Sequence, residues 1–145
     1  MNIYRSLDMV DDYEAIHGNR EAVIRAISLM LAIMRDLGHL LPRIATQSIE
    51  VASRFREGRG DHSLLMGQED LLNERLRDLV ESSNGHSSEF HLVQTAHAIL
   101  VLSRKPRWGG GAGEVLSNFI NALDSAGLSY NPVIDLLDNY FPKPA

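Results

Sequence analysis

The chain has 145 residues, of which 44% are hydrophobic and 23% charged, and its formal net charge at pH 7 is −5. This length suits one domain with a full hydrophobic core, and the composition argues against disorder. The absence of cysteine excludes disulfide frameworks, thiolate nucleophiles and cysteine-bearing metal sites.

The apolar residues have helical spacing along nearly the whole chain, and no run alternates convincingly in the manner of a strand. Leu7, Val10 and Tyr13 indicate a short first helix. The next helix is predicted to begin after an N-cap at Asn19 and to stop at Gly38. Because its apolar residues extend almost all the way round, we expect it to be the central buried helix.

The middle of the chain is predicted to contain two further helices and a long loop. Pro42 suits the first turn of a helix that ends before Gly58. A loop over about residues 58–67 then leads to a helix through residues 71–80.

A serine cap and a proline bound the next helix. Ser87 or Ser88 is predicted to cap it. It ends at Lys105-Pro106, because proline disfavours helical conformation in the residue before it.

A run of glycines around Ala112 separates this helix from the C-terminal part of the chain. A helix through residues 115–123 follows. Asn131-Pro132 then opens a last helix, which stops before Pro142.

Together these elements predict an all-α fold, a compact single-domain bundle of six or seven helices over residues 1–145. The N-terminal residues run directly into acidic positions, so we expect no signal peptide. The most apolar stretch, residues 27–34, is far shorter than the roughly 20 residues that a membrane helix needs. We therefore expect a cytoplasmic protein that does not contact a membrane.

One face of the helix around Leu76 carries four carboxylates, which we call the acidic ridge. Its members are Asp70, Glu74, Asp78 and Glu81. At about 100° per residue they fall within roughly 80° of one another, opposite the apolar face. Such a ridge suits a partner protein with a basic surface. The alternative is an ordinary solvated face, partly neutralised by Arg77.

A second candidate for partner binding is the glycine-rich segment and its flanks, with Arg104, Arg107 and Trp108. We expect a mobile loop here, and tryptophan and arginine are over-represented among binding hot spots. The alternative is that the tryptophan plugs the bundle and the glycines form a slack connection. Glycines before a helix can cradle phosphate. Here, however, no Lys-Ser or Lys-Thr follows them, and Glu114 would repel an anion.

Four acidic residues also crowd the N-terminal region: Asp8, Asp11, Asp12 and Glu14. The turn glycine and alternating oxygen ligands of a calcium loop are missing from this segment. We therefore interpret the group as negative charge at the start of the first helix, where the helix dipole favours it.

The histidines do not show the His-Glu-x-x-His spacing of a zinc helix, so we expect no metal and no cofactor. His97 falls on an apolar face and is predicted to be a core histidine with its hydrogen bonds satisfied. An enzyme remains the first alternative function. It would be a small metal-assisted hydrolase that uses His62, His91 or His97 with nearby carboxylates.

A basic group lies on the helix before Gly58 and just after it: Arg43, Arg54, Arg56 and Arg59. It supports a second alternative, a regulator that binds nucleic acid, which the net negative charge makes the least favoured. Because Glu50 lies four residues before Arg54, we expect a solvated face whose charges pair with one another.

Since the chain carries no catalytic constellation, the sequence favours a non-catalytic protein-interaction module. One concrete form is a small bacterial inhibitor or immunity-type protein that neutralises a basic toxin or nuclease, an analogy of size and charge. Nothing in the sequence demands an oligomer.

Overall fold

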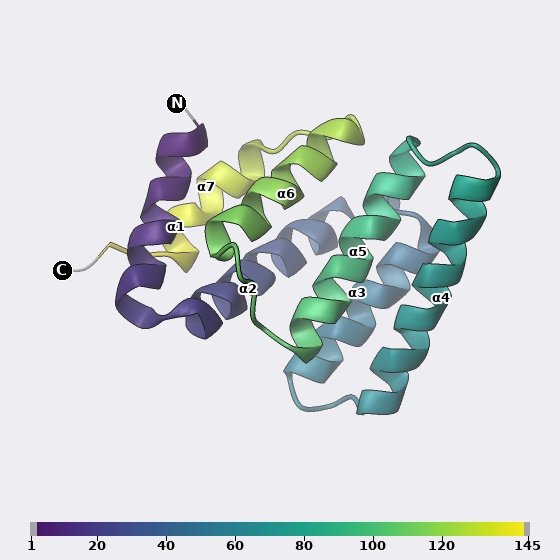
Figure 1. Ribbon diagram of the computed structural model, residues 1–145, viewed down its shortest axis with the longest axis horizontal. Helices are drawn as coiled ribbons and strands as arrows, with labels where there is room; N and C mark the ends of the chain where they lie inside the picture. Colours follow the sequence, from purple (N-terminus) through teal and green to yellow (C-terminus); the bar gives the residue numbers. More distant parts are fainter. Residues whose placement is uncertain (1–2, 144–145) are drawn as a thin grey trace.

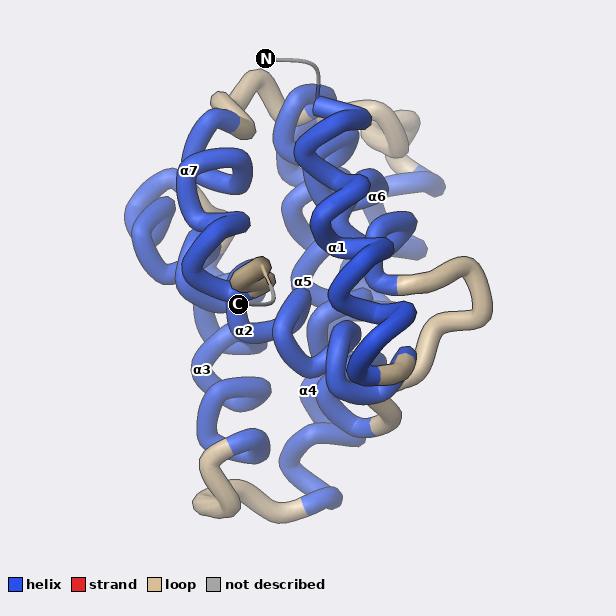
Figure 2. Tube along the Cα trace, turned by 90° about the vertical axis from the view of Figure 1, so that its left-hand side faces the viewer, coloured by secondary structure: helices blue, strands red, loops and turns tan. Residues whose placement is uncertain are grey.

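The computed structural model describes residues 3–143, and within this range every regular element is a helix (Figures 1 and 2). Residues 1–2, part of the segment from which no signal peptide was expected, lie outside the described residues. The elements are α1 (Ile3–His17), α2 (Asn19–Leu37), a 3-10 turn (Gly38–Leu40), α3 (Arg43–Arg56), α4 (His62–Glu81), α5 (Ser88–Arg104), α6 (Ala112–Ser125) and α7 (Asn131–Tyr140). The predicted all-α bundle of six or seven helices is confirmed. No helix of the described part is both long and apolar enough to cross a membrane.

The helices form two groups joined by α2. In one group α3, α4 and α5 pack on one another, and in the other α1 packs against α6 and α7. Figure 1 shows α2 running between the two groups, and it contacts members of both. Nine of its residues are buried, which confirms its prediction as the central helix. A direct contact between α5 and α6 forms a second junction between the groups.

A single residue, Gly18, connects α1 to α2. Its φ of 92° lies in the region that favours glycine, which lets the chain turn sharply between two helices. Gly18 therefore occupies the N-cap position of α2, and the prediction of Asn19 as the cap is wrong. The side chain of Asn19 instead bonds to the loop that precedes α6.

The predicted loop over residues 58–67 is too long, because α4 already begins at His62. The carboxylate of Asp61 accepts a hydrogen bond of 2.7 Å from the backbone N–H of Leu64 and so caps α4. The cap at the start of α5 is confirmed as Ser87, whose hydroxyl accepts from the N–H of Phe90 at 3.1 Å.

The chain after α7 returns to the core through Phe141, which is only 1% exposed. Its ring meets the ring of Tyr13 on α1 edge to face, with centroids 5.5 Å apart. This contact closes the α1–α7 side of the bundle.

Candidate functional site

The acidic ridge lies on the solvent side of α4. Its four carboxylates are all exposed, and none of them forms an ion pair within residues 3–143. Arg77, which was considered as a neutralising neighbour, is exposed and makes no ion pair with them either. The full charge of the ridge therefore faces solvent.

Exposed apolar side chains accompany the ridge. Among the described residues six large hydrophobic side chains are exposed, and three of them lie on α4: Leu64 (60%), Leu71 (50%) and Val80 (58%). Leu64 and Leu71 are seven residues apart and share one side of the helix. Figure 1 shows α4 at the outer edge of the α3–α5 group, so this side has no helix covering it.

The loop between α5 and α6 is anchored to the α1–α2 elbow. The side-chain amide of Asn19 donates to the carbonyl of Trp108 at 2.9 Å, and its oxygen accepts from the N–H of Trp108 at 3.1 Å. A further bond of 3.0 Å joins the N–H of Gly111 to the same carbonyl. These bonds tie the loop to the elbow, so the expectation of a slack connection is wrong. Trp108 does not plug the bundle, since 40% of it is exposed.

The N-terminus of α6 is capped by a residue of α1. The carboxylate of Glu14 accepts from the N–H of Ala112 at 2.7 Å and from the side-chain amide of Asn19 at 3.0 Å. A carboxylate in this position satisfies a free N–H group and complements the helix dipole. It also occupies the place where a phosphate would bind, so the glycine run is no phosphate cradle.

The interpretation of the N-terminal acidic residues as charge at the start of their own helix is wrong. The first turn of α1 contains no acidic residue, because α1 begins at Ile3. Asp11 lies instead beside α6, where a Cβ added to Gly113 would be 2.7 Å from its Oδ1. Burial raises the pKa of Asp11, and the negative charges of Glu14, Asp8 and Asp12 act in the same direction.

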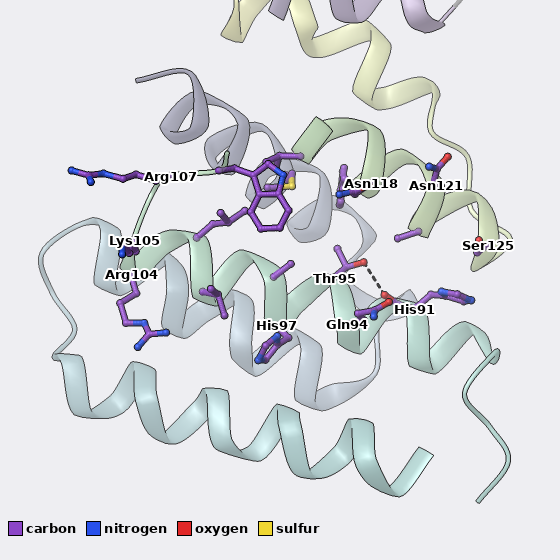
Figure 3. A pocket seen from close by; sticks show the side chains of 18 residues that line it. His91, Gln94, Thr95, His97, Arg104, Lys105, Arg107, Asn118, Asn121 and Ser125 are labelled. Carbon is purple, nitrogen blue, oxygen red and sulfur yellow. Dashed lines mark hydrogen bonds between the residues drawn. The ribbon is translucent and has the colours of Figure 1, made fainter. Parts of the chain in front are cut away.

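A groove of about 1050 Å³ runs between α5 and α6 and ends at the anchored loop (Figure 3). It brings together the three predicted residues Arg104, Arg107 and Trp108, far from the outward side of α4. Buried side chains of four apolar residues contribute to its lining: Met30, Leu102, Val115 and Phe119. Polar side chains from both helices complete it: His91, Gln94, Thr95, Asn118, Asn121 and Ser125.

A half-buried polar cluster lies between α5 and α4, and two of its members, His97 and Arg104, also line the groove. In Figure 3 His97 and Arg104 point from α5 toward α4. Arg104 lies 3.5 Å from the carboxylate of Glu69 and donates to the sulfur of Met66 at 3.2 Å. Arg104 therefore serves the α4–α5 contact and is less available to a partner than the sequence suggested.

His97 is half-buried, and its Nε2 is buried without a hydrogen-bond partner, so the prediction of a satisfied core histidine is wrong. One oxygen of Glu69 and the Nε of Arg104 are also buried without a hydrogen bond. Burial lowers the pKa of His97, and the charge of Arg104 acts in the same direction while Glu69 opposes it.

We expect the protein to lose stability as the pH falls below about 6.5. In the unfolded chain His97 is protonated at its ordinary pKa of about 6.5. In the folded protein the pKa of His97 is lower, so protonation requires a lower pH. The stability is therefore complete above this pH and declines as the pH falls toward the folded-state value. Thermal melts between pH 7.5 and 5.5 should show a smaller decline for His97→Gln than for the wild type. His86→Gln, at an exposed loop position, should leave the decline unchanged. Equal declines in all three proteins would contradict the assignment to His97.

The other histidines of the hydrolase alternative are separated. His91 lines the groove, whereas His62 begins α4 beside Phe55. Within the described part of the chain no three histidine, aspartate or glutamate residues come together in a group that would hold a metal ion.

The basic group is largely engaged in contacts within the protein. Arg54 pairs with Glu50 at 3.2 Å, as predicted, and Arg59 pairs with Glu57. The third member, Arg56, donates to the carbonyl of Ile24 at 3.4 Å, and burial lowers its pKa. The expectation of a face whose charges pair with one another is thus confirmed for Arg54 and Arg59; Arg56 is half-buried and bonds to a backbone carbonyl instead, and Arg43 is exposed.

The sequence reasoning missed the α6 wall of the groove and the role of Glu69. Asn118, Asn121 and Ser125 recur at intervals of three and four residues, which is the spacing of one helix face. This spacing could have indicated from the sequence that α6 presents a polar face. No sequence signal pointed to Glu69, because only the packing of α4 against α5 brings it close to Arg104.

Comparison with known proteins gave no match to a family model, to a curated protein or to a solved structure.

Proposed function

We propose that the protein is a non-catalytic interaction module that binds another protein through the outer side of α4. The observation that carries the proposal is the combination on this edge helix of two exposed leucines, Leu64 and Leu71, with the four unpaired carboxylates of the acidic ridge. Apolar side chains bordered by charge are typical of a protein interface: the apolar part contributes affinity and the charges steer association.

The partner that fits this surface presents an apolar patch bordered by lysine and arginine. A second copy of the chain does not fit, because two acidic ridges would repel each other. A cytoplasmic inhibitor or immunity-type protein that neutralises a basic bacterial toxin or nuclease is the finer form of this proposal. The charge of the ridge supports that form, and the nucleic-acid alternative is disfavoured by the same charge.

Neutralising the ridge should weaken partner binding at least about tenfold, chiefly by slowing association. The test variant is Asp70→Asn/Glu74→Gln/Asp78→Asn/Glu81→Gln. Its matched control removes four exposed carboxylates elsewhere and has the same net charge: Asp36→Asn, Asp124→Asn, Asp135→Asn and Asp138→Asn. Lysate proteins captured on each immobilised variant are quantified by mass spectrometry, and the Kd of the identified partner is then measured at low and high salt.

A partner retained by the wild type and the control, but lost with the ridge variant and with Leu64→Ser/Leu71→Ser, supports the proposal. Salt should weaken its binding to the wild type more than to the ridge variant. If the wild type, the ridge variant, the charge control and the double leucine variant all capture the same proteins, the outer side of α4 is not the binding surface.

A further inference from the structure

The groove between α5 and α6 has the size and lining of a small-molecule site. Its volume of about 1050 Å³ lies just above the range of roughly 300–1,000 Å³ that such sites show. Phe119 from α6, Leu102 from α5 and Met30 from α2 contribute buried apolar surface to it. An apolar ligand body placed here would be removed from water on several sides.

The charge of the lining is opposite to that of the whole protein. The chain has 19 acidic and 14 basic residues, yet no aspartate or glutamate lines the groove. Its charged residues are Arg104, Lys105 and Arg107, and Figure 3 shows all three at one end, where Arg104 points toward α4 and the side chain of Arg107 extends away from the groove. Since Glu69 engages Arg104, the cations left at this end are Lys105 and Arg107, both exposed.

Trp108 lines the groove at the same end, and its backbone is anchored. Its backbone is held on both sides by Asn19, and the loop that carries it is closed by the cap of Glu14 on α6. Binding therefore does not need to order this loop, which removes one entropic cost of association.

We propose that the groove binds an organic anion with an apolar body, such as an aliphatic or aromatic carboxylate. The anionic group meets Lys105 and also Arg107, whose exposed side chain turns toward the groove when the ligand binds. The apolar body lies between α5 and α6 against Trp108. The proposal is independent of the function proposed for α4, because the acidic ridge does not line this groove.

The experiment uses the only tryptophan of the chain as its reporter. Trp108 fluorescence is followed during titration with dodecanoate, and in parallel with dodecyltrimethylammonium, both below their critical micelle concentrations. The two probes share the alkyl chain and differ in the sign of the head group. We expect a saturable change with one dodecanoate per chain and at least tenfold weaker binding of the cation.

Two variants test the two parts of the site. Lys105→Gln/Arg107→Gln should weaken dodecanoate binding about tenfold and reduce the preference for the anion. Ala98→Phe, at an exposed position that lines the groove, should abolish saturable binding by filling it. The matched control Arg35→Gln/Arg43→Gln, which removes two exposed cations elsewhere, should leave the affinity unchanged.

Equal affinity for both amphiphiles, or a change that does not saturate, would overturn the proposal. So would unaltered dodecanoate binding to both the Lys105→Gln/Arg107→Gln and Ala98→Phe variants. Circular dichroism of each variant distinguishes loss of binding from loss of the fold. For Ala98→Phe, a change in the fold would leave the charge variant and the matched cationic probe as the deciding measurements.

Discussion

Replacing Phe141 by alanine is expected to lower the free energy of unfolding by about 3–5 kcal/mol, the usual cost of emptying a buried aromatic site. The side chain is 1% exposed and meets Tyr13 of α1 edge to face at 5.5 Å. Removing it deletes the apolar surface that the segment after α7 buries and leaves a cavity between α1 and α7. Urea unfolding followed by circular dichroism measures the loss.

Leu64→Ala is the matched control for this substitution. Leu64 is 60% exposed, so its truncation should change the free energy of unfolding by no more than about 0.5 kcal/mol. If Phe141→Ala lowers the free energy of unfolding by no more than Leu64→Ala does, the side chain of Phe141 does not contribute to the core.

Replacing Glu14 by alanine is expected to cost about 2 kcal/mol, because a charged acceptor of two hydrogen bonds and the cap of α6 are lost together. The substitution also frees the loop before α6, so the emission of Trp108 should shift to longer wavelength. Urea unfolding and the emission spectrum of the folded protein provide the two measurements.

Two substitutions separate the cap from the charge. Glu14→Gln keeps an acceptor oxygen and should lose less stability than Glu14→Ala. Asp12→Ala removes an exposed carboxylate from the same helix and should leave both stability and emission nearly unchanged. Equal changes in stability and in Trp108 emission for Asp12→Ala and Glu14→Ala would contradict the role of Glu14 as the cap of α6.

Features fixed by neighbouring residues could be predicted from the sequence. The stop of α2 at Gly38, the serine cap of α5 and the end of α5 before Pro106 depend on the residues at those positions. The central place of α2 followed from apolar residues all around it. The acidic ridge likewise needed only helical periodicity, which is why its exposure agrees with the prediction.

Features made by distant segments could not be predicted in this way. Asn19 has the residue type of a helix cap, but Gly18 takes the cap position and Asn19 binds a loop 89 residues away. The acidic residues of α1 have the composition of a helix start, yet Glu14 caps another helix. The groove itself arises only when α5 and α6 pack together.

Glu14 and Ala112 are hydrogen-bonded although they lie 98 residues apart in the sequence. This separation affects the order in which parts of the fold are expected to form. The consecutive helices α3, α4 and α5 can assemble with short connections, whereas contacts between distant segments carry a larger loop-closure entropy. We therefore expect the anchored loop to form late in folding. Any ligand that needs the completed groove will bind the native state alone, and will slow global unfolding in proportion to its occupancy.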